Sequence, residues 1–127
     1  MSPVVAIAQS GLAAATLRLS VSASNLANVQ DASAVGSTAA YDPLEVDSSA
    51  APGGGVSARA VTAKSSQLIS YDPASPVASA QGFVQAPEID PISEVTNQLA
   101  AGRAFAASLA ALKTAEDEQK TLLDLKT

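Results

Sequence analysis

The sequence contains no cysteine and no histidine. Without cysteine there is no disulfide, no thiol nucleophile and no thiolate-based zinc site. Histidine is the side chain most often used for proton transfer near neutral pH, so its absence removes the commonest general base. The lack of disulfides does not fix the compartment, because proteins outside the cytoplasm need not carry them. We therefore predict a protein that is not an enzyme, with no catalytic residues, no cofactor and no metal site.

Aromatic side chains are also scarce. The 127 residues include two Phe, two Tyr and no Trp, although 47% of the residues are hydrophobic. Much of that fraction is alanine, whose burial contributes little at about 0.8 kcal/mol per methylene-sized group. We expect thin, closely spaced helices around a weak core, with part of the stability supplied by neighbouring copies.

Charge is missing from the first 17 residues and concentrated in the middle of the chain. The net charge is −5, and residues 31–90 hold seven acidic and two basic side chains. This balance disfavours nucleic-acid and anionic-membrane partners. The uncharged start has no basic n-region, so we expect no cleaved signal peptide. It is also too short and too rich in Ala and Ser for a membrane span.

The N-terminal segment, from Ser2 to about Asn28, is predicted to be a helix. Ser2 is a good N-cap, and Pro3 occupies the first helical position, where its missing N–H is not needed. Apolar or small residues recur every seven positions along two seams, which is typical of helix-to-helix packing. The seams are Val5, Leu12, Leu19 and Leu26, and Ala8, Ala15, Ser22 and Val29.

The C-terminal segment, from Asp90 to about Leu125, repeats the same start signal. Asp90 is the expected N-cap, and Pro91 is the expected first helical residue. The predicted apolar stripe drifts around the helix and comprises Ile92, Val95, Leu99, Phe105, Leu109, Leu112 and Leu122 or Leu123.

The middle of the chain is rich in Pro, Gly, Ser and Asp. Residues 44–46 and 56–60 are expected to form a small β-hairpin around the glycines at 53–55, and residues 82–84 a further extended piece. The path of residues 31–70 stays open. The predicted fold is mainly α, with the terminal helices packed as an antiparallel, coiled-coil-like hairpin. Its segments are the N-terminal helix (1–30), the β-hairpin and irregular middle (31–89) and the C-terminal helix (90–127).

Several short patterns invite a chemical interpretation. Tyr41-Asp42-Pro43 and Tyr71-Asp72-Pro73 could supply paired carboxylates, but no basic or metal-binding residue accompanies them, so we interpret both as Asp-Pro turns with a packed Tyr. The glycines at 53–55 lack the Lys-Ser/Thr of a phosphate loop, which favours a hairpin tip. The acidic run at 116–118 is typical of a solvated helix face.

Polar residues inside the helices have more than one interpretation each. Arg18 and Arg103 either extend along the surface, pair with a carboxylate of an adjacent subunit, or are simply exposed. Asn25 and Asn28 lie three residues apart on one helix face. They either end the helix or hydrogen-bond backbone groups where the chain turns away.

Four stretches resemble the flagellar rod, hook and hook-associated family. Residues 23–29 (ASNLANV) are similar to its asparagine signature, preceded at 10–12 by what resembles a small-residue turn. Residues 71–76 (YDPASP) and 82–89 (GFVQAPEI), residues 102–105 (GRAF) and the ending from 113 to 125 are similar to the C-type proximal-rod branch. The stretch from 31 to 70 is not recognisable. Gln30, Ser75, Phe83 and Phe105 depart from the usual pattern.

The resemblance implies a structural subunit of the flagellar basal-body rod, which transmits torque and encloses the export channel. It implies helical-hairpin subunits that stack with copies of themselves and with other rod proteins, and export by the flagellar apparatus without a cleaved signal, to the periplasm-spanning rod. No small-molecule substrate is expected. An adaptor or export chaperone built on a helical hairpin is the alternative. The residues expected at subunit interfaces are Val5, Leu12, Leu19, Asn25, Leu26, Asn28, Leu99, Arg103, Phe105, Leu109, Leu112 and Leu122.

Overall fold

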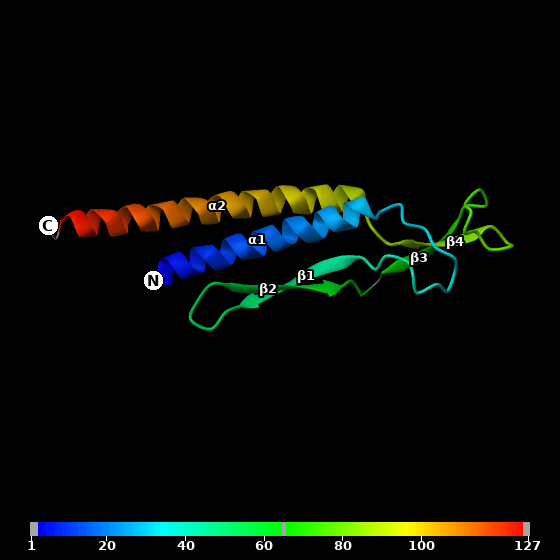
Figure 1. Ribbon diagram of the computed structural model, residues 1–127, viewed down its shortest axis with the longest axis horizontal. Coiled ribbons are helices and arrows are strands. Elements are labelled where there is room, and N and C mark those ends of the chain that lie inside the picture. The colour runs from blue at the N-terminus through cyan, green and yellow to red at the C-terminus, as the bar shows by residue number, and fades with distance from the viewer. Residues whose placement is uncertain (1–2, 65, 126–127) are drawn as a thin grey trace.

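The computed structural model describes residues 3–64 and 66–125. Two long helices, α1 (Pro3–Ala27) and α2 (Pro91–Asp124), lie side by side and run in opposite directions (Figure 1). Two antiparallel strand pairs occupy the chain between them. The pairs are β1 (Leu44–Ala50) with β2 (Val56–Thr62), and β3 (Gln67–Tyr71) with β4 (Phe83–Pro87). The predicted pair of long terminal helices and the antiparallel β region are therefore confirmed.

The molecule is long and layered. Helix α1 lies between α2 and the β1–β2 hairpin, and it contacts both (Figure 1). The β3–β4 pair lies beyond the ends of the helices and forms a separate tip. Since α1 has 25 residues and α2 has 34, α2 is about 13 Å longer. Its C-terminal turns project past the start of α1.

The helix boundaries follow local signals in the sequence. Asp90 caps α2 by accepting hydrogen bonds from the backbone N–H groups of Ile92 and Ser93, at 3.1 and 3.3 Å, which satisfies two of the donors left free at a helix start. Pro91 is the first residue of the helix, as predicted. The predicted N-cap of α1, Ser2, lies outside the described residues.

The core is small and consists mainly of alanine and valine. Its buried apolar residues are Val5, Ala8, Ala14, Ala15, Val21, Ala40, Val84, Ala101 and Ala115. This composition agrees with the expectation of closely spaced helices and a weak core.

By length and composition alone, helix α1 is long and apolar enough to cross a membrane, with a mean hydropathy of 1.5 over 18 residues. The uncharged residues 1–17 considered in the sequence are too short to span a membrane. The helix that forms is longer, with 25 residues.

Both predicted seams of α1 are covered, to different degrees. In α1 the alanine seam at Ala8, Ala15 and Ser22 is fully buried, whereas Leu12, Leu19 and Leu26 are only half-buried. In α2 the covered face is small and polar, with Ala101 and Ala115 buried. The stripe predicted from Ile92 to Leu122 is largely exposed and takes little part in the α1–α2 contact. Small side chains let two helix backbones approach closely, and the larger side chains are then turned outward.

The two strand pairs have different origins in the sequence. The β1–β2 hairpin turns at residues 51–55, as predicted, and the glycines there all have positive φ. Strand β4 matches the expected extended piece. Strand β3 was not foreseen. It pairs Tyr71 with Phe83, whose rings meet edge to face with centroids 5.5 Å apart.

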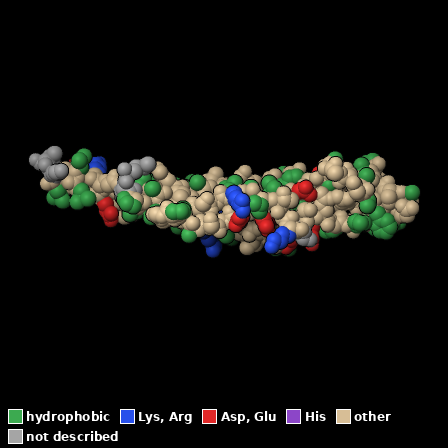
Figure 2. Space-filling model, turned by 90° about the horizontal axis from the view of Figure 1, so that it is seen from below, with side chains coloured by type: hydrophobic (Ala, Val, Ile, Leu, Met, Phe, Trp, Pro, Cys, Tyr) green, Lys and Arg blue, Asp and Glu red, His purple; other side chains and the backbone are tan. Residues whose placement is uncertain are grey.

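Charged side chains gather over the middle of the molecule when it is seen from the hairpin side, while hydrophobic side chains cover the tip (Figure 2). In the hairpin, Asp47 and Arg59 stand opposite each other and form an ion pair at 2.8 Å. Both side chains are more than half exposed, so this pair contributes little to stability.

Candidate functional site

Asn25, near the end of α1, makes four side-chain hydrogen bonds to other parts of the chain. It is 2% exposed. Its amide nitrogen donates to the carbonyl oxygen of Leu44 and to Oε1 of Glu94, both at 2.8 Å. Its amide oxygen accepts from the backbone N–H of Leu44 and the hydroxyl of Tyr41, both at 2.9 Å. This one side chain therefore joins the end of α1, the start of β1 and the first turns of α2.

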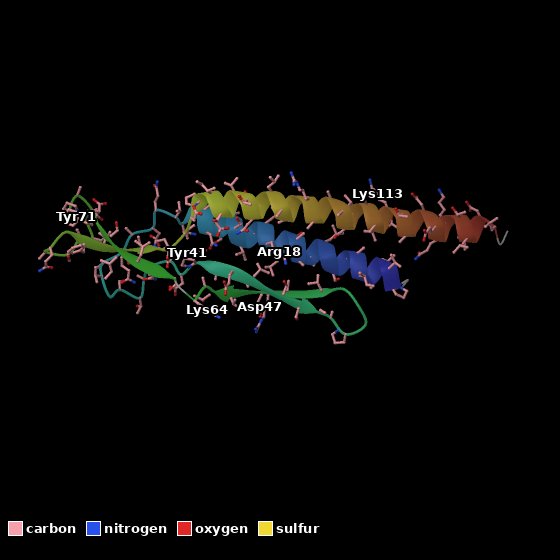
Figure 3. The ribbon with its side chains drawn as sticks, turned by 180° about the vertical axis from the view of Figure 1, so that it is seen from behind. Arg18, Tyr41, Asp47, Lys64, Tyr71 and Lys113 are labelled. Carbon is pink, nitrogen blue, oxygen red and sulfur yellow. The ribbon has the colours of Figure 1, made fainter. Side chains whose placement is uncertain are left out.

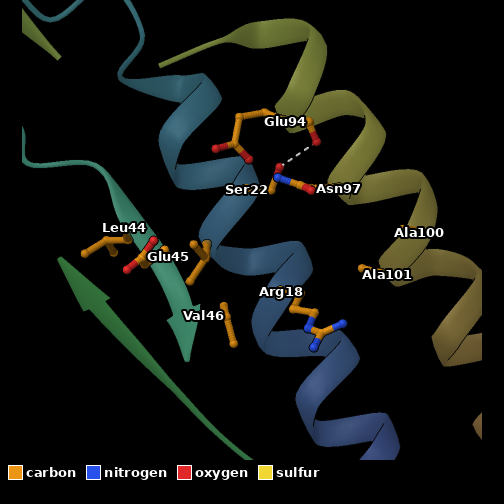
Figure 4. A pocket seen from close by; sticks show the side chains of 10 residues that line it. Arg18, Ser22, Leu44, Glu45, Val46, Glu94, Asn97, Ala100 and Ala101 are labelled. Carbon is orange, nitrogen blue, oxygen red and sulfur yellow. Dashed lines mark hydrogen bonds between the residues drawn. The ribbon is translucent and has the colours of Figure 1, made fainter. Parts of the chain in front are cut away.

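Two serines of α1 extend this polar junction. Ser22 is 2% exposed, and its hydroxyl donates to the carbonyl oxygen of Glu94 at 2.8 Å (Figure 4). The hydroxyl of Ser24 is 3.0 Å from that of Tyr41. We name the set Ser22, Ser24, Asn25, Tyr41 and Glu94 the polar junction. Buried polar groups that are all paired hold neighbouring elements in one arrangement.

The two asparagines of the signature have different roles. Asn25 bonds the backbone of β1, which agrees with the interpretation that it holds the chain after the turn. Asn28 donates to the carbonyl oxygen of Ser24 at 2.8 Å and so bonds the last turn of its own helix, as a helix stop does. The sequence left both interpretations open for the pair, and the structure uses one for each residue.

Both Tyr-Asp-Pro stretches are structural, but only the second forms a turn. Asp72 accepts from the backbone N–H of Ala74 at 3.2 Å, and Tyr71 packs on Phe83 in the tip. Residues 41–43 instead form neither turn nor strand and lead directly into β1, with Tyr41 bonded to Asn25. The prediction of a turn at residues 41–43 was therefore wrong, because the chain there is held by the polar junction.

The two tyrosines thus lie in different parts of the molecule. Tyr41 is beside the end of α1, where the helices meet the strands, whereas Tyr71 lies in the tip (Figure 3). Asp42, the carboxylate next to Tyr41, accepts from the side-chain amide of Gln67 at 2.9 Å. The two Tyr-Asp-Pro stretches therefore do not combine into a paired-carboxylate site.

The small-residue motif at 10–12 lies inside α1 and forms no turn, which corrects the expectation drawn from the resemblance. The hydroxyl of Ser10 accepts from the backbone N–H of Val56 at 3.1 Å and so holds the hairpin against the helix. Gly11 faces α2, where a Cβ atom at its position would lie 2.6 Å from the hydroxyl of Ser108. The motif therefore marks the place where both neighbours of α1 come close.

A groove beside the polar junction runs between α1, α2 and β1 (Figure 4). Arg18 lies in it and donates to the hydroxyl of Ser48 at 3.1 Å. Asn97 lines the α2 side. Among the described residues, no group of three metal-ligating side chains is found. The residues that line the groove join elements of the fold and contain no arrangement of nucleophile and base.

The predicted interface residues fall into three classes. Val5 and Asn25 are buried within the chain, where they hold the fold together. Leu12, Leu19, Leu26, Asn28 and Leu112 are half-buried. The exposed ones are Leu99, Arg103, Phe105, Leu109 and Leu122, and these are available to another subunit. Their assignment to subunit interfaces stays a prediction.

Sequence reasoning missed the partners of the junction. Tyr41 was interpreted as a packing residue, and Glu94 was seen only as part of the C-terminal segment. Their partner Asn25 lies 16 and 69 residues away along the chain. A local sequence pattern does not predict contacts between residues that far apart. The asparagine signature itself was the only signal in the sequence.

Comparison with known proteins gives a consistent result. Residues 80–125 match the family model described as "Flagellar basal body rod FlgEFG protein C-terminal". The chain is 35% identical over 126 residues to the flagellar basal-body rod protein FlgC of Salmonella typhimurium, with 94% of this chain and 92% of that protein covered. It is 33% identical to FlgC of Escherichia coli O157:H7, with the same shares covered. With FlgC of Bacillus subtilis the identity is 27%, over 84% of this chain and 85% of that protein.

Proposed function

The chain belongs to the family of flagellar basal-body rod proteins of the FlgC type, and from that premise we propose that its helix pair packs side by side with those of neighbouring subunits to build the wall of the rod. Family membership makes it a structural subunit of the proximal rod that assembles with other rod components, and not an enzyme. The finer proposal concerns which surfaces meet, whether copies of this chain meet one another, and how the protein reaches the rod.

The observation that carries the proposal is the exposed face of α2. Its covered side is lined mainly by small and polar residues, and most of its large apolar residues are exposed, with Ile92, Val95 and Leu99 at 79%, 57% and 59% exposure. A run of exposed apolar side chains on one helix face usually marks an interface. Contacts between unlike surfaces of identical subunits do not close on themselves, and they generate helical arrays.

The spacing of the covered residues favours coiled-coil-like packing within the pair. On α2 the covered positions are separated by steps of three, four or seven, and they are Glu94, Gln98, Ala101, Ser108, Leu112 and Ala115. On α1 the buried positions Ala8, Ala15 and Ser22 are seven apart. A seven-residue repeat keeps one seam of each helix facing the other.

The position of α1 in the fold suggests that the N-terminal helix is not removed during export. Residues 3–27 supply most of the core and three residues of the polar junction. We propose that the subunit is exported by the flagellar apparatus with this helix retained. Mass spectrometry of the chain from purified basal bodies should then recover peptides covering residues 3–27. A mature chain that begins after Ala27 would contradict this proposal.

Leu109→Asp and Leu19→Asp test the assembly. Leu109 is exposed on α2, so its replacement should leave the helix pair folded and abolish incorporation into the rod. Leu19 is half-buried, and its replacement should weaken the pair itself. The measurements are swimming motility and immunoblots of detergent-extracted basal bodies. Ser57→Asp, on the exposed side of the hairpin, is the matched control and should leave both unchanged. Normal motility of both leucine variants would contradict the proposal.

The alternative, an adaptor or export chaperone, predicts a chain that stays in the cytoplasm and dissociates from its partner. The relatives compared above are all named as rod proteins, and no contact among the described residues favours the alternative. Fractionation separates the two, because a rod subunit remains with the basal body after detergent extraction.

A further inference from the structure

The tip formed by β3 and β4 leaves the outer edge of β3 open. On the other side of the pair, β4 is covered at Gln85, whose backbone N–H and C=O both bond the backbone of Ser33, at 2.9 and 2.8 Å. Gln85 stands opposite Ile69 of β3. Residues that stand opposite each other in an antiparallel pair point their backbone groups either toward each other or both away. The backbone groups of Ile69 therefore point away from β4.

This direction alternates along a strand, so the backbone groups of Gln67 and Tyr71 point outward as well. Each of these three residues offers one N–H and one carbonyl oxygen. In the part of the chain that the structure describes, no hydrogen bond reaches any of these groups. We name the row of Gln67, Ile69 and Tyr71 the β3 edge. Unpaired backbone groups in such a row are a template for another strand.

The side chains of β3 leave this edge unprotected. Leu68, Ile69 and Tyr71 are 42%, 63% and 66% exposed. The strand contains no charged residue and no proline, although natural proteins often protect an open edge with one or the other. The hairpin follows that rule, because β1 carries Glu45 and Asp47. An exposed apolar edge without such protection is typical of an interaction site.

Carboxylates stand at both ends of the β3 edge. Asp72 directly follows the strand, and at its start Asp42 accepts from the side-chain amide of Gln67 at 2.9 Å. Both carboxylates are exposed. Residues 66–89 contain no Lys or Arg. The nearest cation along the chain is Lys64, and among the described residues no ion pair joins it to either carboxylate. The charges that complement this edge are therefore positive.

We propose that an extended segment of another rod protein, with a Lys or Arg on each side of about five uncharged residues, adds to the β3 edge as a third strand of the tip. The inference rests on the proposed function and names a surface through which this subunit meets a different one. The unpaired backbone groups favour an extended chain, whose main-chain hydrogen bonds supply affinity. The flanking carboxylates favour a basic one.

The charges disfavour a second copy of this chain as the added strand. Two β3 edges that paired with each other would bring Asp42 and Asp72 of one copy beside the same residues of the other. Strand β1 is acidic as well, with Glu45 and Asp47, and in β2 the cation Arg59 is already bonded to Asp47. With a net charge of −5, two copies repel. The basic segment therefore belongs to a different protein.

Photo-cross-linking in purified basal bodies tests the proposal. A photo-reactive phenylalanine analogue replaces Tyr71, which is aromatic and 66% exposed, in the otherwise native chain of a motile host. Irradiation should yield an adduct with a different rod protein, and mass spectrometry should place the cross-link in a segment with Lys or Arg on both sides. An adduct of this chain with itself, an adduct with a segment that lacks those cations, or no adduct from basal bodies that contain the labelled chain would each overturn the proposal.

Proline at position 69 tests the backbone contact. It removes the outward N–H of Ile69 but no hydrogen bond between β3 and β4, which is why a strand edge tolerates proline. Ile69→Pro should abolish the adduct formed from position 71, or the incorporation of the chain into the rod. Ile69→Ala keeps the N–H and is the matched control, which should retain both. Helix content in osmolyte should be unchanged in both variants, because the tip lies beyond the helices (Figure 1). Equal results from the two variants would overturn strand addition.

The charges are tested by Asp42→Asn/Asp72→Asn. Asparagine keeps the side-chain oxygens that accept from Gln67 and Ala74 but removes both charges. The yield of the adduct should fall roughly three- to tenfold. Glu45→Gln, on the exposed side of the hairpin, is the control and should leave it unchanged. An unchanged yield from the double variant would overturn the choice of a basic partner. Absence of the native chain from purified basal bodies would instead refute the proposed function itself.

Discussion

At the scale of single residues, the position of Asn25 explains why an amide is needed there. Its amide nitrogen and oxygen serve four bonds at once, two of them to the backbone of Leu44. A carboxylic acid has nearly the same shape but, when ionised, only accepts. An alanine would leave the N–H of Leu44 and the carboxylate of Glu94 without this partner.

Asn25→Asp is therefore expected to destabilise the helix pair by about 2–4 kcal/mol, because two carboxylates then meet at a part-buried contact. The stability is measured from helix formation in increasing osmolyte, followed by circular dichroism. Adding Glu94→Gln should restore much of the loss, since glutamine can donate to the new carboxylate. Asn28→Asp is the control and should cost about 1 kcal/mol or less. Equal losses at positions 25 and 28 would contradict the role given to Asn25.

The N-cap residue Asp90 makes the stability of α2 depend on pH. The hydroxyl of Ser93 and the backbone N–H of Ile92 hold the pKa of the Asp90 carboxyl below its ordinary value. Because this pKa is lowered in the folded chain, the ionised Asp90 stabilises the fold at pH values above about 3.9, the pKa of an aspartate in an unfolded chain. This stabilisation is lost as the pH falls through the folded value.

The helix content of the native chain in osmolyte should therefore fall below about pH 4 more steeply than that of Asp90→Asn. Asparagine also caps helices but does not titrate. Ser93→Ala, which removes the main cause of the lowered pKa, should make the acid transition shallower than in the native chain. If the native chain kept its full advantage over the Asp90→Asn variant down to pH 2, this assignment would be refuted.

At the scale of elements, Gly11 and Gly102 form a natural pair for comparison. Both lie within helices, but only Gly11 is opposed by the other helix, at Ser108. At Gly102 an added Cβ would meet no side chain or neighbouring element within 4 Å. The two glycines therefore separate the intrinsic cost of glycine in a helix from the need for close approach.

Gly102→Ala should stabilise the chain by about 0.5–1 kcal/mol, the usual gain of alanine over glycine in a helix. Gly11→Ala should gain less, because the hydroxyl of Ser108 has to move aside. Adding Ser108→Ala should recover part of that difference. Osmolyte titration with circular dichroism compares these variants with the native chain. An equal gain from both single glycine variants would show that the helices do not approach closely at Gly11.

The elements also show how far sequence patterns reach. The two helices, the cap at Asp90 and the β1–β2 hairpin each follow from local signals, and all were predicted. Strand β3 was missed because residues 67–71 gain their partner only when β4 lies beside them. The stripe of α2 was identified as an apolar face, but periodicity does not show which partner covers a face.

At the scale of the whole molecule, the three layers leave much of the surface of both helices uncovered. The core is mostly alanine and valine, and such a core contributes little for each ordered residue. We expect the isolated chain to be only partly helical and to complete its fold on docking in the rod.

Circular dichroism of the purified chain should therefore show less helix than the 25 residues of α1 and the 34 of α2 would give together. Helix content should rise with added osmolyte, which favours compact states. A cooperative thermal transition of a fully helical monomer would argue against folding on assembly.

The sequence by itself determined the class of the protein. The absence of cysteine and histidine, the alanine-rich repeats and the family motifs are all local or compositional properties, and they pointed away from catalysis and toward a rod subunit. Tertiary structure decided which face of each helix is covered and which residues Asn25 joins. Those contacts link positions 16–69 residues apart, and they depend on backbone separation and layer order, which the order of residues along the chain does not display.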